Sequence, residues 1–96
     1  MQDDRFEWND AKARANLEKH EVSFEVARLV FDDPAGIDEI DDRAEYGEDR
    51  FTTTGMVGER LLTVTYTERD GRIRIISARK ATRREQDSYF SPNLQD

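Results

Sequence analysis

The strongest structural signal in the chain is the segment RLLTVTYTERDGRIRIISA, residues 60–78. Its first half alternates, so that Leu62, Val64 and Tyr66 face one way and the residues between them face the other. Asp70-Gly71 is a dipeptide typical of a tight turn, and residues 72–78 then return as an apolar, β-branched run. The segment therefore predicts two antiparallel strands, over residues 60–67 and 72–78.

Two more strands are predicted before this hairpin. Residues 50–56 are β-branched and aromatic, and Val57-Gly58-Glu59 forms a turn into the strand that follows. Residues 35–40, with Ile37 and Ile40 as apolar anchors, predict a short first strand, and the acidic residues 41–49 predict a loop. These segments together predict an antiparallel meander of about four strands.

Two helices are predicted at the beginning of the chain. Asn9 is a good N-cap for a helix that runs to about His20, where basic residues suit the helix dipole. Ser23 caps a second, amphipathic helix over residues 24–31, and Asp32-Asp33-Pro34 ends it because the residue before proline avoids the helical region.

A third helix is predicted after the meander. Thr82 caps residues 83–90, and Glu85 at the third helical position completes a capping box. Residues 91–96 form a polar tail. The order of elements predicts a single α+β domain over residues 1–96, with the two N-terminal helices packed on one face of the sheet and the other face free for function.

Composition excludes several classes of protein. The chain has no cysteine, which rules out disulfides and thiolate metal sites. No apolar run follows Met1, and no stretch approaches the roughly 18 apolar residues of a membrane span. We therefore expect a cytoplasmic protein without a signal peptide and without a membrane partner.

The net charge of −7 argues at first against binding to nucleic acid, but the charge is unevenly distributed. Residues 1–50 carry 16 acidic and 7 basic residues, whereas residues 51–96 carry 6 acidic and 8 basic ones. A polyanion would therefore meet one basic segment, between Arg60 and Arg84.

Metal, nucleophile and cofactor chemistry have little support in the sequence. His20 is the only histidine, and the acidic residues 38–42 lack the spacing and the turn glycine of a calcium loop. The chain also lacks a nucleophile elbow and a glycine-rich phosphate loop. We therefore expect no metal site and no cofactor.

Arginine is the remaining chemical signal. A guanidinium group matches the oxygens of phosphate two at a time, and the start of the last helix adds free backbone N–H groups beside it. The residues concerned are Arg69, Arg72, Arg74, Arg79, Lys80, Arg83 and Arg84. They predict an anion site, with surface ion pairs as the alternative explanation.

Three ordered motifs resemble the BrnT toxin family. The first is F-x-W-x(3)-K-x(3)-N-x(2)-K-H over residues 6–20, and the second covers residues 22–34. The third combines residues 66–69 with residues 72–85. The resemblance spans nearly the whole chain, from about Phe6 to Tyr89.

The resemblance implies both a fold and a function. The family is similar to RelE-type ribonucleases, so it implies a toxin of a type II toxin–antitoxin system that cuts RNA without a metal and inhibits translation. Its partners would be RNA, free or on the ribosome, and a cognate antitoxin of the ribbon-helix-helix type that neutralises it. Operator DNA would be bound only through the antitoxin.

Within that resemblance, roles can be suggested for particular residues. Arg79 and Arg83 are candidates to clamp the scissile phosphate, beside Arg69. Glu68 is a candidate base, or the partner of an arginine. His20 is a candidate acid or base, or a residue that only favours the helix dipole.

The remaining candidates would bind RNA. Lys19, Lys80, Arg84 and Arg74 would contact phosphates, and Tyr66 would stack on a base or pack in the core. The sequence pI of about 4.7 is unusual for a ribonuclease. It leaves open an alternative function, a non-catalytic RelE-like binding module that acts with its antitoxin in operon autoregulation.

Overall fold

The computed structural model describes residues 1–41 and 49–91. Its elements are β1 (Phe6–Glu7), α1 (Asp10–His20), α2 (Phe24–Ala27), the 3-10 helix η1 (Arg28–Asp32), β2 (Ile37–Ile40), β3 (Phe51–Val57), β4 (Arg60–Arg69), β5 (Arg72–Lys80) and α3 (Arg83–Phe90). Most of the predicted acidic loop and of the polar tail lies outside the described residues.

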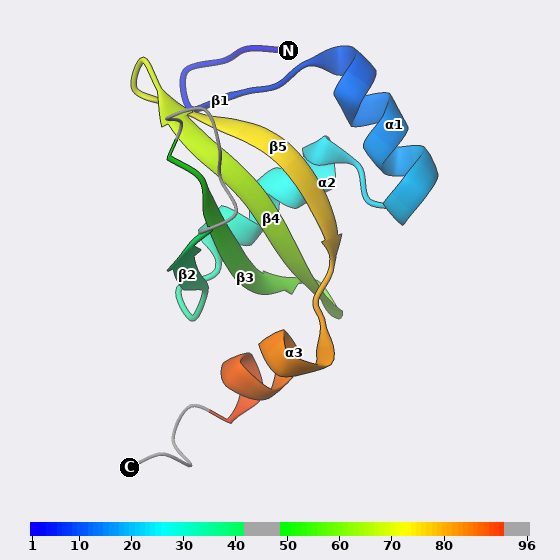
Figure 1. Cartoon of the computed structure of the whole chain (residues 1–96), viewed down its shortest axis with the longest axis vertical. Coiled ribbons are helices and arrows are strands. Elements are labelled where there is room, and N and C mark those ends of the chain that lie inside the picture. Colours follow the sequence, from blue (N-terminus) through cyan, green and yellow to red (C-terminus); the bar gives the residue numbers. More distant parts are fainter. Residues whose placement is uncertain (42–48, 92–96) are drawn as a thin grey trace.

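The sheet has five strands in the order β1-β5-β4-β3-β2 (Figure 1). Strands β2 to β5 form the predicted antiparallel meander, but the prediction of a four-stranded, purely antiparallel sheet is wrong. β1 pairs in parallel with β5, so that Phe6 lies opposite Ile73. A strand of two residues gives no periodic sequence pattern, so β1 was not predicted. It forms because Phe6 is buried in the core, which distant segments build.

The predicted hairpin turns are confirmed. Asp70 and Gly71 both have positive φ, as a two-residue turn matched to the twist of the strands requires, and Gly58 also has positive φ. The β4–β5 hairpin is longer than predicted, since β4 continues to Arg69 and β5 to Lys80.

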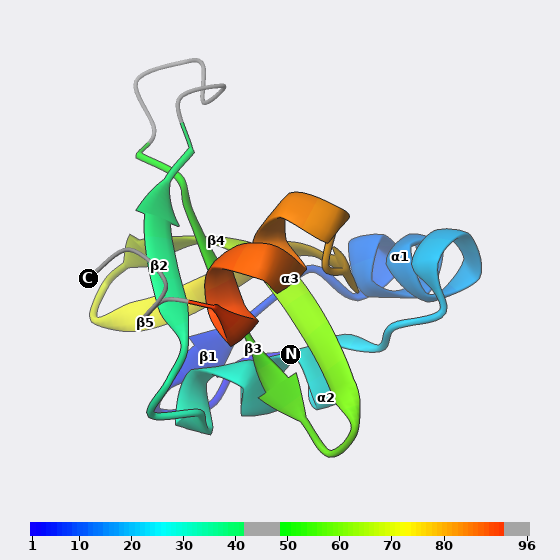
Figure 2. The ribbon, with the colours of Figure 1, turned by 90° about the horizontal axis from the view of Figure 1, so that it is seen from below.

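One face of the sheet carries the hydrophobic core. Leu62, Val64 and Ile75 of the sheet are packed with Phe24 and Val30 of the helical segment behind it. Figure 2 shows α2 and α3 on opposite sides of the sheet. The face turned to α2 is therefore the core face, and α3 covers part of the other one.

The arrangement of the helices differs from the prediction. α1 packs beside β5 at the sheet edge, where the Asn16 amide bonds to the backbone of Ala78. The predicted second helix is a short α-helix that tightens into the 3-10 helix η1 before Asp33-Pro34, as often occurs near a helix end. None of the described helices is long and apolar enough to cross a membrane.

The sequence predicted that the face opposite the core is free, but α3 covers part of it. α3 begins after the Thr82 cap, and its capping box with Glu85 is present as predicted. Glu85 accepts a hydrogen bond from Thr63 of β4, and the Tyr89 hydroxyl donates to Asp33 at 2.6 Å. These two contacts hold α3 against the end of the sheet.

Candidate functional site

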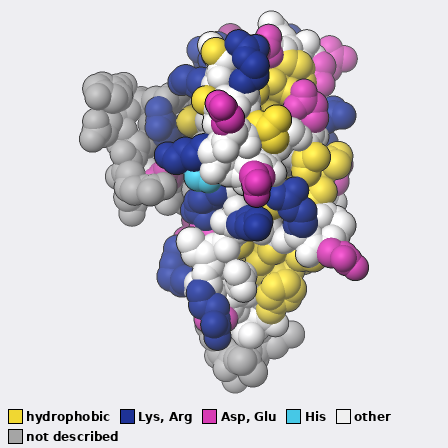
Figure 3. All heavy atoms as spheres, turned by 90° about the vertical axis from the view of Figure 1, so that its right-hand side faces the viewer, with side chains coloured by type: hydrophobic (Ala, Val, Ile, Leu, Met, Phe, Trp, Pro, Cys, Tyr) yellow, Lys and Arg dark blue, Asp and Glu magenta, His cyan; other side chains and the backbone are white. Residues whose placement is uncertain are grey.

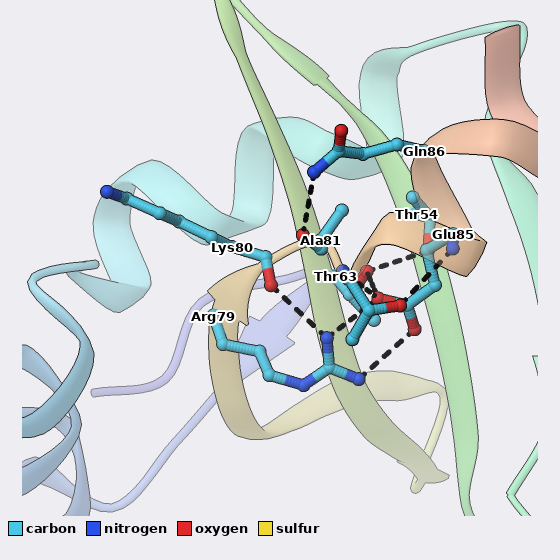
Figure 4. Close-up of polar contacts among 8 residues, drawn as sticks. Thr54, Thr63, Arg79, Lys80, Ala81, Glu85 and Gln86 are labelled. Carbon is cyan, nitrogen blue, oxygen red and sulfur yellow. Dashed lines mark hydrogen bonds and ion pairs between the residues drawn. The ribbon is translucent and has the colours of Figure 1, made fainter.

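Arg79 is the second-last residue of β5, shortly before α3, and an ion pair orients its side chain. Its Nη1 donates to Glu85 Oε1 at 2.7 Å and its Nη2 donates to Glu85 Oε2 at 3.1 Å (Figure 4). Nη1 also donates to the carbonyl of Lys80 at 3.2 Å. Nε makes no hydrogen bond within the described part of the chain. These bonds occupy the end of the guanidinium, while Nε and the second Nη2 hydrogen have no partner among the described residues, and the side chain is 31% exposed.

Glu85 is a buried carboxylate with a full set of donors. Besides Arg79 it accepts from the backbone N–H of Thr82 at 2.8 Å and from Thr63 Oγ1 at 3.0 Å, and it is 7% exposed. Burial alone raises the pKa of this carboxyl group. The hydrogen bonds from Arg79, Thr82 and Thr63, with the charge of Arg79, outweigh burial and lower the pKa to about 2. Glu85 is therefore ionised at neutral pH and holds Arg79 in place.

Local sequence explains why this junction is well defined. The Thr82 side chain accepts from the backbone N–H of Glu85 at 3.2 Å, so α3 starts with only two residues between it and the end of β5. The backbone N–H of Ala81 donates to the carbonyl of Leu61, so the linking residues are tied to β4. The junction between β5 and α3 consequently places Arg79 beside a helix N-terminus.

The other basic residues of the junction point outward. Lys80 extends away from Arg79 (Figure 4), as alternation along β5 requires. Arg83 is exposed and donates to Asp87 at 3.3 Å, a weak pair within one helical turn. Lys80 and Arg84 make no hydrogen bond or ion pair among the described residues, so both remain available to a ligand.

The end of α1 lies beside the end of β5 and the start of β4. Asn16 ties α1 to Ala78 of β5, and Arg60 at the start of β4 donates to the carbonyl of Glu21 at 3.3 Å. Lys19 and His20 form the last residues of this helix. Figure 3, which looks at the side that carries α1, shows Lys and Arg side chains gathered along one margin and hydrophobic side chains along the other.

Lys19 and His20 end α1, Arg79 and Lys80 end β5, and Arg83 and Arg84 begin α3. The side chains of Arg79 and Lys80 alternate to opposite faces of the sheet. Glu68 and Arg69 are elsewhere. Thr63, which pairs with Arg79, is five residues before Glu68 on β4, a separation of about 16 Å along an extended strand. Alternation also turns Glu68 to the core face and Arg79 to the opposite face. The five predicted catalytic residues therefore do not form a single site.

Arg69 and Arg74 are engaged in ion pairs, the alternative that the sequence left open. Both donate to Glu7 Oε2, at 3.3 and 3.2 Å respectively. Glu7 belongs to β1, and its side chain is only 12% exposed. These arginines join β1 to the β4–β5 hairpin and have their guanidinium groups directed to a carboxylate.

Tyr66 is part of the core and is not placed to stack on RNA. Its ring contacts Phe31, with centroids 5.0 Å apart, and Phe51, with centroids 5.6 Å apart. The residue is 8% exposed. Core packing, the second role considered for this residue, is the one that the structure shows.

Two residues at the junction were missed as site residues. Glu85 was recognised only as part of a capping box, and its position six residues after Arg79 gave no signal of a pair that joins a strand to a helix. Asn16 stood in the first motif without a role, yet its amide forms an edge contact with β5. Among the described residues, no group of three or more His, Asp or Glu side chains is placed to hold a metal ion.

The fold and the junction define a small α+β protein with an oriented arginine suited to an anionic ligand. Comparison with protein families identifies the group: a family model described as "Ribonuclease toxin, BrnT, of type II toxin-antitoxin system" matches residues 8–85, and the chain belongs to this family. This confirms the resemblance found in the sequence. A search of curated proteins gave no match. Membership implies a ribonuclease toxin with an antitoxin partner.

Proposed function

We propose that this chain is a metal-independent endoribonuclease with a RelE-like mode of action, which inhibits translation by cutting RNA. A cognate antitoxin, of the ribbon-helix-helix type, neutralises it and carries the complex to operator DNA. The observation that carries the proposal is Arg79, fixed by Glu85 with its Nε and Nη2 edge open at the β5–α3 junction.

The proposed reaction is attack of an RNA 2′-hydroxyl on the adjacent phosphorus. A base takes the hydroxyl proton, an acid protonates the leaving 5′ oxygen, and negative charge grows on the phosphoryl oxygens. Arg79 compensates that charge through its open edge, because an arginine already held in place needs no reorganisation during the reaction. Cationic side chains take the role that a metal ion has in other nucleases.

His20 is the residue that we assign to proton transfer. It is the only histidine of the chain, histidine is the most frequent general acid or base, and the end of α1 lies beside the end of β5. Lys19, Lys80, Arg83 and Arg84 would hold neighbouring phosphates of single-stranded RNA, free or on the ribosome. Glu68, Arg69, Arg74 and Tyr66 are left out because the structure places them elsewhere.

The test is cleavage of a labelled single-stranded RNA by purified, antitoxin-free protein in the presence of EDTA. We expect cleavage by the wild type and a loss of about 100-fold or more in rate for Arg79→Ala, the usual effect of removing one charge-stabilising donor. Arg69→Ala, at the far end of β4, is the matched control and should retain activity. Cell-free translation supplies the second readout.

Two results would count against the nuclease. One is intact RNA with the wild type, and the other is an Arg79→Ala variant that cleaves as fast as the wild type. In either case the alternative function takes its place, a non-catalytic RelE-like module that acts with its antitoxin in autoregulation. Arg79 is 31% exposed and already paired with Glu85, the observation that favours this alternative.

A further inference from the structure

A hollow lies on the core face of the sheet, away from Arg79. It has a volume of about 120 Å³ and is formed where η1, β2, β3 and β4 meet. Tyr66 and Phe31 belong to its wall, and the more exposed Asp38 and Glu68 also border it. Alternation along β4 turns Tyr66 and Glu68 to this face and Thr63, opposite Arg79, to the other. The hollow is therefore separate from the β5–α3 junction.

Three polar side chains around this hollow, those of Tyr66, Asp38 and Glu68, have no hydrogen-bond partner among the described residues. Tyr66 is more than nine-tenths buried, yet its hydroxyl makes no hydrogen bond within the described part of the chain. Asp38 and Glu68 form neither an ion pair nor a side-chain hydrogen bond there. Among the described residues, no lysine, arginine or histidine belongs to the lining. No fully buried side-chain oxygen or nitrogen of these residues lacks a partner, so the Tyr66 hydroxyl is accessible. With the exposed carboxylates of Asp38 and Glu68 it offers acceptors to a ligand that donates hydrogen bonds and carries positive charge.

No neighbouring arginine among the described residues forms an ion pair with Asp38 or Glu68. Arg5, Arg69 and Arg72 border an adjacent depression that also includes Glu68. Each already donates to another acceptor: Asp32 for Arg5, Glu7 for Arg69 and the carbonyl of Asp3 for Arg72. Asp33, the third carboxylate of the lining, already accepts hydrogen bonds from the N–H groups of Ala35 and Met56 and from the Tyr89 hydroxyl.

We propose that this hollow binds the guanidinium group of an arginine side chain from outside the chain. The volume corresponds to about four water molecules, which suits a guanidinium group. A guanidinium offers five donors to Tyr66, Asp38 and Glu68, and it can lie against the half-buried ring of Phe31.

Other cations fit less well. Calcium takes six to eight oxygen ligands, and among the described residues no three His, Asp or Glu side chains are grouped to hold a metal ion. An ammonium group lacks the planar shape that stacks on aromatic walls. The electrostatics agree with a cation: burial raises the pKa of Tyr66, and the charges of Asp38 and Glu68 raise it further, to about 12.

The arginine can come from the antitoxin or from a free molecule. The antitoxin is the partner that family membership implies, and the acidic residues 1–50 of this chain would attract a basic partner. Binding in this hollow does not depend on nuclease activity, so it can be tested whether or not the protein cuts RNA.

The test is a titration of the ¹⁵N-labelled full chain with N-acetyl-argininamide, followed by NMR. We expect saturable shifts of the backbone amides of Asp38, Thr53 and Tyr66. Glu68→Gln should weaken binding about tenfold, the loss expected when one charge-assisted hydrogen bond is removed. Glu39→Gln is the matched control, because Glu39 pairs with Thr52 and turns to the opposite face. N-acetyl-glutaminamide, which has no charge, should not bind.

The outcomes separate the proposal from its alternatives. Absence of saturable shifts, equal binding to Glu68→Gln and wild type, or equal binding of the neutral glutamine analogue would overturn it. A second measurement compares the affinity of the antitoxin for wild type and Glu68→Gln. Weaker antitoxin binding by Glu68→Gln than by wild type identifies the antitoxin as the source of the arginine. If the wild type binds N-acetyl-argininamide as expected but the antitoxin binds both proteins equally, the source is a free molecule.

Discussion

At the scale of single residues, the Arg79–Glu85 pair has a consequence for stability. The folded-state pKa of Glu85 is about 2, below its ordinary value of 4.5. A depressed carboxylate pKa stabilises the fold above the unfolded pKa, and this stabilisation is lost as the pH falls from about 4.5 toward 2. We expect the wild type to lose roughly 3 kcal/mol through this residue in acid, an order-of-magnitude value.

Urea unfolding at several pH values between 2 and 6 measures this contribution in wild type and in Glu85→Gln. The amide keeps an acceptor for Thr82 but carries no charge, so the difference between the two curves should narrow as the pH falls. Other carboxylates with lowered pKa, such as Asp33, titrate in both proteins and cancel. Asp87→Asn, at an exposed position, is the control. A difference that does not change with pH would show that Glu85 is not specifically stabilised as a carboxylate.

The same residues show which parts of the site can be predicted from sequence. The cap role of Glu85 was predictable because it depends on Thr82, three residues away. The pairing of Arg79 with Glu85 and of Arg74 with Glu7 depends on how a strand meets another element, so a list of arginines cannot separate free from engaged ones. Tyr66 shows the same limit, since alternation fixes its face of the sheet but not the rings that cover it.

At the scale of elements, Asn16 replaces a strand at the edge of the sheet. β1 pairs with β5 only at Ile73 and Arg74, and farther along β5 the Asn16 amide takes over. Its Nδ2 donates to the carbonyls of Ala78 and Val22, both at 2.9 Å, and its Oδ1 accepts from the N–H of Ala78 at 3.1 Å. This single buried side chain therefore joins α1 to β5 and positions Lys19 and His20.

We expect Asn16→Ala to destabilise the fold by about 2–4 kcal/mol, because it leaves three buried backbone groups without partners. Urea unfolding measures the loss, and hydrogen exchange locates it, with faster exchange of the Ala78 amide. Leu17→Ala is the control on the same helix, since Leu17 is 48% exposed. Unchanged protection of the Ala78 amide in Asn16→Ala would contradict this role.

Element prediction succeeded where the signal was local. The caps Asn9, Ser23 and Thr82 each accept from a backbone N–H three residues on, and the turn at Asp70-Gly71 depends on those two residues alone. β1 was not predicted, and the second half of the helix predicted over residues 24–31 is the 3-10 helix η1. β1 has two residues and depends on distant β5, and η1 is tightened by packing against the sheet and by the approaching Pro34.

At the scale of the whole molecule, the central question is how a chain of net charge −7 approaches a polyanion. Lys19, Lys80 and Arg84 make no side-chain hydrogen bond or ion pair among the described residues, and they lie where α1 ends, β5 ends and α3 begins. With Arg79 and Arg83 they can contact about four or five phosphates. The acidic residues elsewhere would repel RNA and restrict it to these basic residues.

This arrangement predicts a steep dependence of RNA affinity on salt. For single-stranded RNA the slope of log affinity against log salt is about −0.7 per phosphate contacted, so we expect roughly −3. Fluorescence anisotropy with a 2′-O-methylated RNA, which cannot be cut by attack of its 2′ oxygen, measures binding without cleavage. Arg84→Gln should make the slope shallower by about 0.7. Arg72→Gln, at the far end of β5, should leave the slope unchanged. A flat salt response of the wild type would mean that these cations do not hold RNA phosphates, whatever activity the protein has.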